Sequence, residues 1–191
     1  FAHTACAAGW QVLAIDLPEH GVRKNDPEKL LPWVAVPEIQ TVYARMQPVW
    51  KHIRIYGVSI GAWLAMQTLQ ELKPDRALFV SPVMDMESLI TGMMQAANVT
   101  EAQLQAAGEI STAFGETLSW PYLCWVREHP LQWKVPTQVL YGAKDNLTSQ
   151  TALEQFRQQS GAHLTILEDG EHWFHTPLQM AVLQSWEEQH L

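Results

Sequence analysis

A serine between two glycines stands where an apolar, strand-like stretch gives way to a helix-like one. The stretch is Tyr56-Gly57-Val58-Ser59-Ile60-Gly61-Ala62. A G-x-S-x-G sequence at a strand-to-helix turn exposes the serine hydroxyl, and the flanking glycines let backbones pass where a Cβ would collide. Serine is also common in ordinary turns, which is the structural alternative. The strand and helix patterns on either side favour Ser59 as a nucleophile.

A serine hydroxyl is a weak nucleophile at neutral pH, so it needs a base and an acid that orients the base. Asp145 follows a predicted strand and turn, and His172 follows the last predicted strand. The carboxyl ends of strands are where open α/β sheets gather their sites. We therefore expect Ser59 to attack a carbonyl carbon, neutral His172 to take its proton, and Asp145 to orient the imidazole. Hydrolysis should then fall as the pH drops through roughly 6–7, because an imidazolium accepts no proton.

Other residues compete for these roles. Asp85, in SPVMDM, also follows a predicted strand and is the alternative acid. His175 lies three residues after His172, a spacing that metal ligands also use, but no further ligand cluster accompanies the pair. We therefore predict no metal site. His20 is explained by the loop in which it stands.

The elements that must position these residues alternate between strand and helix. Apolar runs predict strands at 11–17, 53–58, 76–81, 137–142 and 164–167, and helical spacing predicts helices at 1–9, 32–46, 60–72, 149–159 and 177–189. This alternation predicts an α/β fold with a mostly parallel sheet and helices on both faces. Residues 1–84 and 133–191 would form this core.

The pattern changes between residues 85 and 132. Methionine, alanine and aromatic residues run there in helical bursts without a convincing strand, and Thr100 with Gln103 predicts a capping box. We expect 85–132 to be a helical cap inserted over the sheet.

Four stretches in register resemble the α/β-hydrolase family, in particular its capped esterase, lipase and serine-aminopeptidase-like members. They are VLAIDLPEHGVR, YGVSIGA, LYGAKDNLT and GEHWF, which are similar to the family's strand 4 with its loop, nucleophile elbow, acid loop and histidine loop. The backbone N–H of Ile60, at the helix start, would be one oxyanion donor. The resemblance implies a second donor from the loop after strand 3, and this sequence contains no such loop.

The resemblance also places strand 3 between residues 11–17 and 53–58. Without it, a buried parallel sheet would have unpaired backbone groups, each costing about 1–3 kcal/mol. We therefore expect the fold to be N-terminally incomplete, as in a fragment of a longer protein; the alternative is a five-stranded sheet in which 11–17 and 53–58 pair directly. If Phe1 is the physical start, we expect little or no turnover, because half the oxyanion hole is missing.

Charge and composition exclude some classes of binding partner. The 191 residues carry a net charge of −8, which gives no electrostatic footprint for nucleic acid. No apolar run approaches the roughly 18–20 residues of a membrane helix, and the first residues do not read as a signal peptide, so we expect a cytoplasmic protein. No cofactor is implied, and the oligomeric state is left open.

Residues of the expected cap would choose the substrate. Met84, Met93, Trp120 and Trp125 are soft or rigid apolar side chains that could line an acyl or alkyl pocket, although most residues of this kind pack a core. We expect a small-molecule carboxylic ester or thioester with an apolar group, hydrolysed through an acyl-enzyme. An acyltransferase or peptidase with the same triad, or a catalytically silent binding protein, is the alternative.

Overall fold

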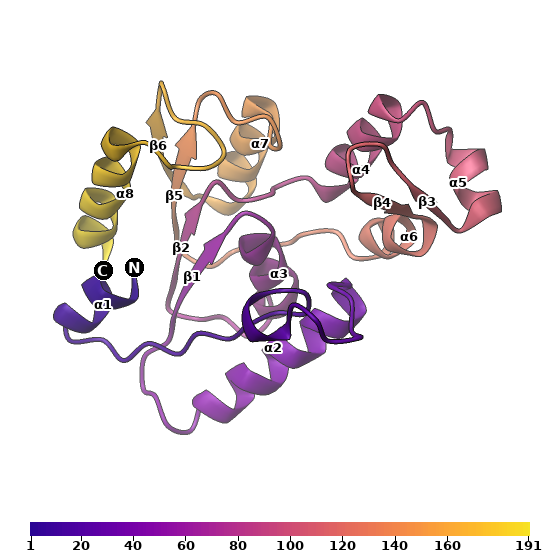
Figure 1. Ribbon diagram of the computed structural model, residues 1–191. Coiled ribbons are helices and arrows are strands. Elements are labelled where there is room, and N and C mark those ends of the chain that lie inside the picture. The colour runs from indigo at the N-terminus through magenta and orange to yellow at the C-terminus, as the bar shows by residue number, and fades with distance from the viewer.

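The computed structural model describes all residues 1–191 and is built on a four-stranded sheet (Figure 1). The strands lie in the order β1-β2-β5-β6 and all pair in parallel. They are β1 (Arg54–Val58), β2 (Arg76–Val80), β5 (Thr137–Gly142) and β6 (His163–Leu167). Because parallel neighbours end at one edge, the segments that follow β1, β5 and β6 meet there. The predicted α/β fold with a parallel sheet is confirmed.

Helices cover both faces of this sheet. The helices of the chain are α1 (Ala2–Ala7), the 3₁₀ turn η1 (Gly21–Arg23), α2 (Pro32–Met46), α3 (Ile60–Leu69), α4 (Met86–Ala96), α5 (Glu101–Ala107), α6 (Trp120–Glu128), α7 (Gln150–Ser160) and α8 (Pro177–His190). Figure 1 shows α1 and α8 on one face of the sheet and α3 and α7 on the other. No helix is both long and apolar enough to cross a membrane.

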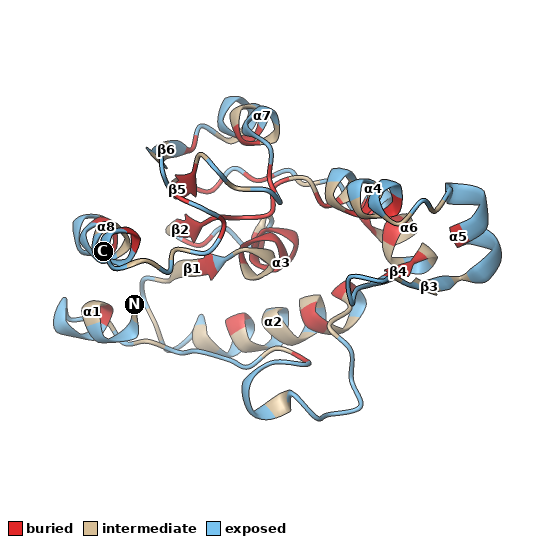
Figure 2. Ribbon diagram, turned by 45° about the horizontal axis from the view of Figure 1, so that its top comes forward, coloured by how far each residue is buried: buried red, intermediate tan, exposed pale blue.

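The alternation of side chains along β2 creates a core on each face of the sheet. Ala77 and Phe79 pack into the larger cluster with residues of α3 and α7. Leu78 and Val80 point the other way and pack with Trp186 of α8. Figure 2 shows the central strands and α3 as the most buried part of the molecule.

The prediction of a strand at residues 11–17 is wrong. This stretch forms no ladder, and β1 pairs only with β2, so the alternative of a five-stranded sheet is also wrong. Leu13 and Ile15 are 48% and 40% exposed. An apolar run becomes a strand only when a neighbouring strand takes its backbone hydrogen bonds, and none lies beside this one.

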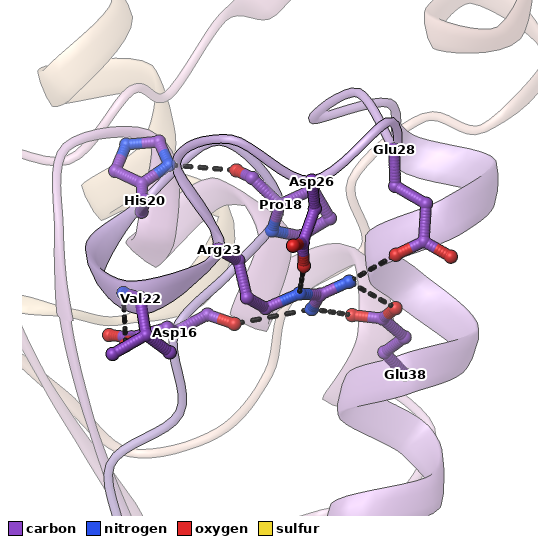
Figure 3. Close-up of polar contacts among 8 residues, drawn as sticks. All are labelled: Asp16, Pro18, His20, Val22, Arg23, Asp26, Glu28 and Glu38. Carbon is purple, nitrogen blue, oxygen red and sulfur yellow. Dashed lines mark hydrogen bonds and ion pairs between the residues drawn. The ribbon is translucent and has the colours of Figure 1, made fainter.

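The loop after residue 17 is tied to α2 by one arginine (Figure 3). The guanidinium of Arg23 donates to both carboxylate oxygens of Glu38 on α2, at 2.7 and 3.0 Å, and to the Asp16 carbonyl oxygen at 3.2 Å. Asp26 and Glu28 also accept from it. These hydrogen bonds raise the pKa of the guanidinium above its ordinary value. Arg23 is thus the central donor of this loop.

Between β2 and β5 the chain forms α4, α5, α6 and a short antiparallel hairpin of β3 (Glu109–Ser111) and β4 (Thr117–Ser119). The expectation of no strand at 85–132 is therefore wrong, because three-residue strands are too short to show a period of two. The capping box is confirmed: the Thr100 hydroxyl accepts from Gln103 N, and the Gln103 side chain accepts from Thr100 N.

One side chain connects the helices of this segment. Arg127 on α6 donates to Glu87 on α4 at 2.7 Å and to Glu101 on α5 at 2.8 and 2.9 Å. Its charge is therefore already paired. The assignment of 85–132 as a separate cap stays a prediction.

Candidate active site

Ser59 occupies a strained turn between the end of β1 and the start of α3. Its backbone has φ 52° and ψ −123°, a conformation that costs a non-glycine residue about 1–3 kcal/mol and persists only when the surroundings impose it. Those surroundings are the end of β2 and the loop after it: Ser59 N donates to Val80 O at 3.0 Å, and Val83 N donates to Ser59 O at 3.3 Å.

The two glycines around Ser59 differ in their roles. A Cβ on Gly57 would lie 2.7 Å from the Ala62 Cα, so only glycine allows the first turn of α3 to fold back over β1. A Cβ on Gly61 would meet no atom within 4 Å. The expectation of a collision at both positions is therefore wrong for Gly61, which faces open space.

Asp145 and His172 are brought together by two loops that cross where β5 and β6 end. A Cβ on Gly142 would lie 2.5 Å from the Gly170 carbonyl, so the backbones touch at these two glycines. Lys144 N donates to Gly170 O at 2.8 Å and adds a hydrogen bond between the loops. This contact places the acid loop directly beside the histidine loop.

Three side chains separated by many residues form one hydrogen-bonded chain. Ser59 Oγ lies 2.8 Å from Nε2 of His172, and Nδ1 of His172 lies 2.8 Å from Oδ2 of Asp145. The side chains of His172 and Asp145 are 3% and 0% exposed. Because a carboxylate only accepts, Nδ1 carries the ring proton and Nε2 of the neutral ring is free to accept from the serine hydroxyl.

The backbone around this chain supplies further donors. Asp145 Oδ1 accepts from Leu147 N at 2.7 Å and from Thr148 N at 3.0 Å. Ile60 is the first residue of α3, and its N–H makes no hydrogen bond within the protein. A free N–H beside Ser59 at a helix start is suited to an oxyanion on a carbonyl carbon bound to Oγ.

The competing residues have other partners. Asp85 caps α4, where its carboxylate accepts from Ser88 N at 2.9 Å and Ser88 Oγ at 2.6 Å. His175 faces the Trp173 carbonyl at 2.8 Å and the Glu171 carboxylate at 3.3 Å. His20 Nδ1 donates to Pro18 O at 2.9 Å within its own loop (Figure 3). Neither alternative, Asp85 or His175, is hydrogen-bonded to Ser59, whose hydroxyl contacts His172.

The four expected substrate-binding residues pack in two places. Met84 is buried in the larger core and lines a groove of about 420 Å³ beside α7 that none of the three hydrogen-bonded residues lines. Met93 and Trp120 are half-buried against the cluster under α4–α6. Trp125 stacks on His129, with ring centroids 4.0 Å apart. Their contact with a substrate stays a prediction.

Sequence reasoning overlooked Thr148. Its hydroxyl donates to Pro82 O at 2.8 Å, its N–H donates to Asp145, and its carbonyl accepts from Tyr141 OH at 2.7 Å. Burial, with a smaller effect of the Asp145 charge, raises the pKa of Tyr141. Thr148 therefore joins the acid loop to the end of β2. The only signal in the sequence was a threonine close after the aspartate.

Solved structures of similar fold cover most of this chain. Est1E from Butyrivibrio proteoclasticus, in a structure with ferulic acid bound, matches 91% of this chain with 73% of its own at 17% identity and a TM-score of 0.71. A candidate hydrolase from Agrobacterium vitis S4 matches 91% with 74% of its own at 18% identity and a TM-score of 0.70. Alpha/beta hydrolase domain-containing protein 10 from mouse matches 81% with 68% of its own at 16% identity and a TM-score of 0.60. At these identities the likeness is one of fold.

No curated protein matches the sequence. A family model does: the one described as "Alpha/beta hydrolase family" matches residues 2–181. This match spans nearly the whole chain. The parallel sheet and the strained turn at Ser59 agree with it. The chain belongs to the alpha/beta hydrolase family.

Proposed function

We propose that this protein is a serine hydrolase that cleaves a carboxylic ester or thioester with an apolar group through Ser59, His172 and Asp145. The observation that supports the proposal most directly is the chain of two 2.8 Å contacts from Ser59 Oγ through the imidazole to the Asp145 carboxylate. A turn serine with a structural role has no need of a buried histidine and aspartate in line with its hydroxyl.

The proposed reaction has two halves. In the first, Oγ bonds to the carbonyl carbon as its proton passes to Nε2 of His172, and the carbonyl oxygen becomes an oxyanion that the Ile60 N–H stabilises. The bond to the leaving oxygen or sulfur then breaks, and Nε2–H donates its proton to that leaving atom. In the second half, water gives a proton to Nε2 and attacks the acyl carbon, and the bond to Oγ breaks as Oγ regains a proton.

Asp145 stays ionised throughout this cycle. Its carboxylate holds Nδ1–H and balances the positive charge that the imidazole gains in each half-reaction. The two backbone N–H groups on Oδ1 keep the carboxylate in place while this charge comes and goes. The low exposure of both side chains strengthens the interaction, because water screens it weakly.

A fluorophosphonate probe followed by intact-mass measurement tests the proposal. The probe reacts with an activated serine, so we expect one label on the protein and none on Ser59→Ala. Ser111→Ala, an exposed serine on β3, is the matched control and should label like the parent. Labelling that persists in Ser59→Ala would rule out Ser59 as the nucleophile. Absence of labelling in the parent would favour a catalytically silent binding protein.

Turnover separates the remaining alternatives. Release of acid from p-nitrophenyl esters of graded chain length is expected, with the acyl group ending on water. Preferential transfer of the acyl group to an added alcohol would indicate an acyltransferase instead. Faster cleavage of the matching p-nitroanilides would indicate a peptidase.

A further inference from the structure

One tryptophan is exposed directly beside the hydrogen-bonded chain. Trp173 is 67% exposed although its chain neighbour His172 is 5% exposed. Of the nine tryptophans in the sequence, only Trp173 and Trp33 are exposed, and Trp33 lies on α2 at 41%. A large aromatic side chain left in water beside a buried histidine offers apolar surface at that point.

The indole packs against the imidazole. The rings of Trp173 and His172 meet edge to face, with centroids 5.6 Å apart and planes at 90°. The Trp173 carbonyl faces His175 Nδ1 at 2.8 Å, which restrains the backbone. The indole N–H makes no hydrogen bond within the protein and can donate to a bound molecule. A rigid side chain with two rotatable bonds loses little entropy when it binds a ligand.

The proposed proton donation by His172 indicates which part of a substrate would lie near Trp173. Nε2–H delivers its proton to the leaving oxygen, so the leaving alcohol has to lie next to the imidazole. A side chain packed against that imidazole therefore lies closer to the alcohol part of an ester than to its acyl part. Leu147, 37% exposed and hydrogen-bonded through its N–H to Asp145, adds apolar surface beside the same loops.

Building on the proposed hydrolase function, we propose that Trp173 contacts the alcohol part of the substrate and favours an aromatic or aralkyl group there. The planar group would pack on the indole face next to His172. Trp173 is then a specificity-determining residue, and the preferred substrates are esters of benzyl-type or phenolic alcohols.

Three esters and three variants of the full chain, two at Trp173 and one control, test this assignment. Benzyl acetate carries the aromatic group on the alcohol, ethyl phenylacetate carries it on the acid, and ethyl acetate carries none. For Trp173→Ala we expect kcat/KM for benzyl acetate to fall about three- to tenfold, the range of an aromatic contact, with less than a twofold change for the other two. Trp173→Phe should keep most of the activity on benzyl acetate. Leu178→Ala, an exposed apolar residue on α8, is the matched control and should change none of the three.

Each other pattern overturns the assignment. An equal loss on all three esters would mean that Trp173 acts through His172. A loss confined to ethyl phenylacetate would place the contact on the acyl side. No change would mean that the indole touches no substrate.

A binding measurement keeps this inference separate from the proposed function. In Ser59→Ala, saturation-transfer NMR should show the phenyl protons of benzyl acetate in contact with the protein, and the signal should be lost in Ser59→Ala/Trp173→Ala. If the parent neither hydrolyses esters nor takes the fluorophosphonate label, the hydrolase proposal fails while a Trp173-dependent signal still supports the contact. Absence of this signal in Ser59→Ala would overturn the contact itself.

Discussion

The Asp145 carboxylate faces His172 with one oxygen and is held by the backbone through the other. Oδ2 lies 2.8 Å from Nδ1 of His172, while Oδ1 accepts from Leu147 N and Thr148 N. The orientation of the acid is therefore set by its own loop and does not depend on the histidine. Because the two oxygens have different partners, a substitution can remove the charge of the side chain while keeping its orientation.

Asp145→Asn is expected to lower kcat by about 10⁴ without unfolding the protein. The amide oxygen can still accept from Leu147 N and Thr148 N, but the amide NH₂ would donate to Nδ1. The imidazole proton then sits on Nε2, which can no longer accept from Ser59. Ester turnover and circular dichroism check the two halves of the prediction.

Asp169→Asn is the control for that substitution, because Asp169 is an exposed acid on the neighbouring loop that pairs with Lys144 at 2.7 Å. It should keep its activity. An Asp145→Asn protein that retains most of its turnover would mean that another group orients His172.

The sequence was sufficient to predict which side chains lie together. It was not sufficient to predict the backbone contacts that bring them together. Ser59, Asp145 and His172 were identifiable because each follows an apolar run, and parallel strands bring their carboxyl ends to one edge. The close approach of Gly142 to Gly170 depends on how two loops cross, and no local pattern encodes such a crossing.

Non-local pairing also explains the error at residues 11–17. Its apolar run satisfies every local rule for a strand, yet a strand requires a neighbour with free backbone groups, and that condition lies outside the stretch itself. The β3–β4 hairpin was missed for the opposite reason. Its pairing is local, but three residues a side carry too little alternation to be noticed.

Gly57→Ala should destabilise the protein by about 1–3 kcal/mol, the typical cost of forcing extra atoms into a packed site. The new Cβ would lie 2.7 Å from the Ala62 Cα, so the start of α3 has to move away from β1. Urea unfolding measures the loss, and fluorophosphonate labelling should slow because Ser59 lies between the displaced segments.

Gly92→Ala is the matched control for the glycine substitution. Gly92 lies within α4, and a Cβ there would meet nothing within 4 Å. Alanine is the better helix former by about 0.8–1.0 kcal/mol, so this variant should be as stable as the parent or more so. Equal stability of the two variants would show that the contact at Gly57 is loose.

Arg23→Ala should release the loop between residue 17 and α2. The loss removes the donor that Glu38, Glu28, Asp26 and the Asp16 carbonyl share, so amide hydrogen exchange in residues 18–28 should speed up. Arg157→Ala is the control, since Arg157 pairs only with Glu154 within α7. Unchanged exchange in 18–28 would mean that the loop is held by other contacts.

All four tyrosines should ionise at a higher pH in the folded protein than in the unfolded chain. Burial raises the pKa of Tyr43, Tyr56, Tyr122 and Tyr141, and Tyr56 additionally donates to the Glu187 carboxylate at 2.6 Å. A pKa raised in the folded state means that the stabilisation is complete below the ordinary value near 10, and that the free energy of unfolding falls as the pH rises above it. Absorbance at 295 nm should therefore begin to rise at a higher pH in the folded protein than in 6 M guanidinium, where it should rise near pH 10. Tyr56→Phe should make the alkaline loss of stability shallower. Tyrosinate that forms near pH 10 in the folded protein would show that water reaches these phenols.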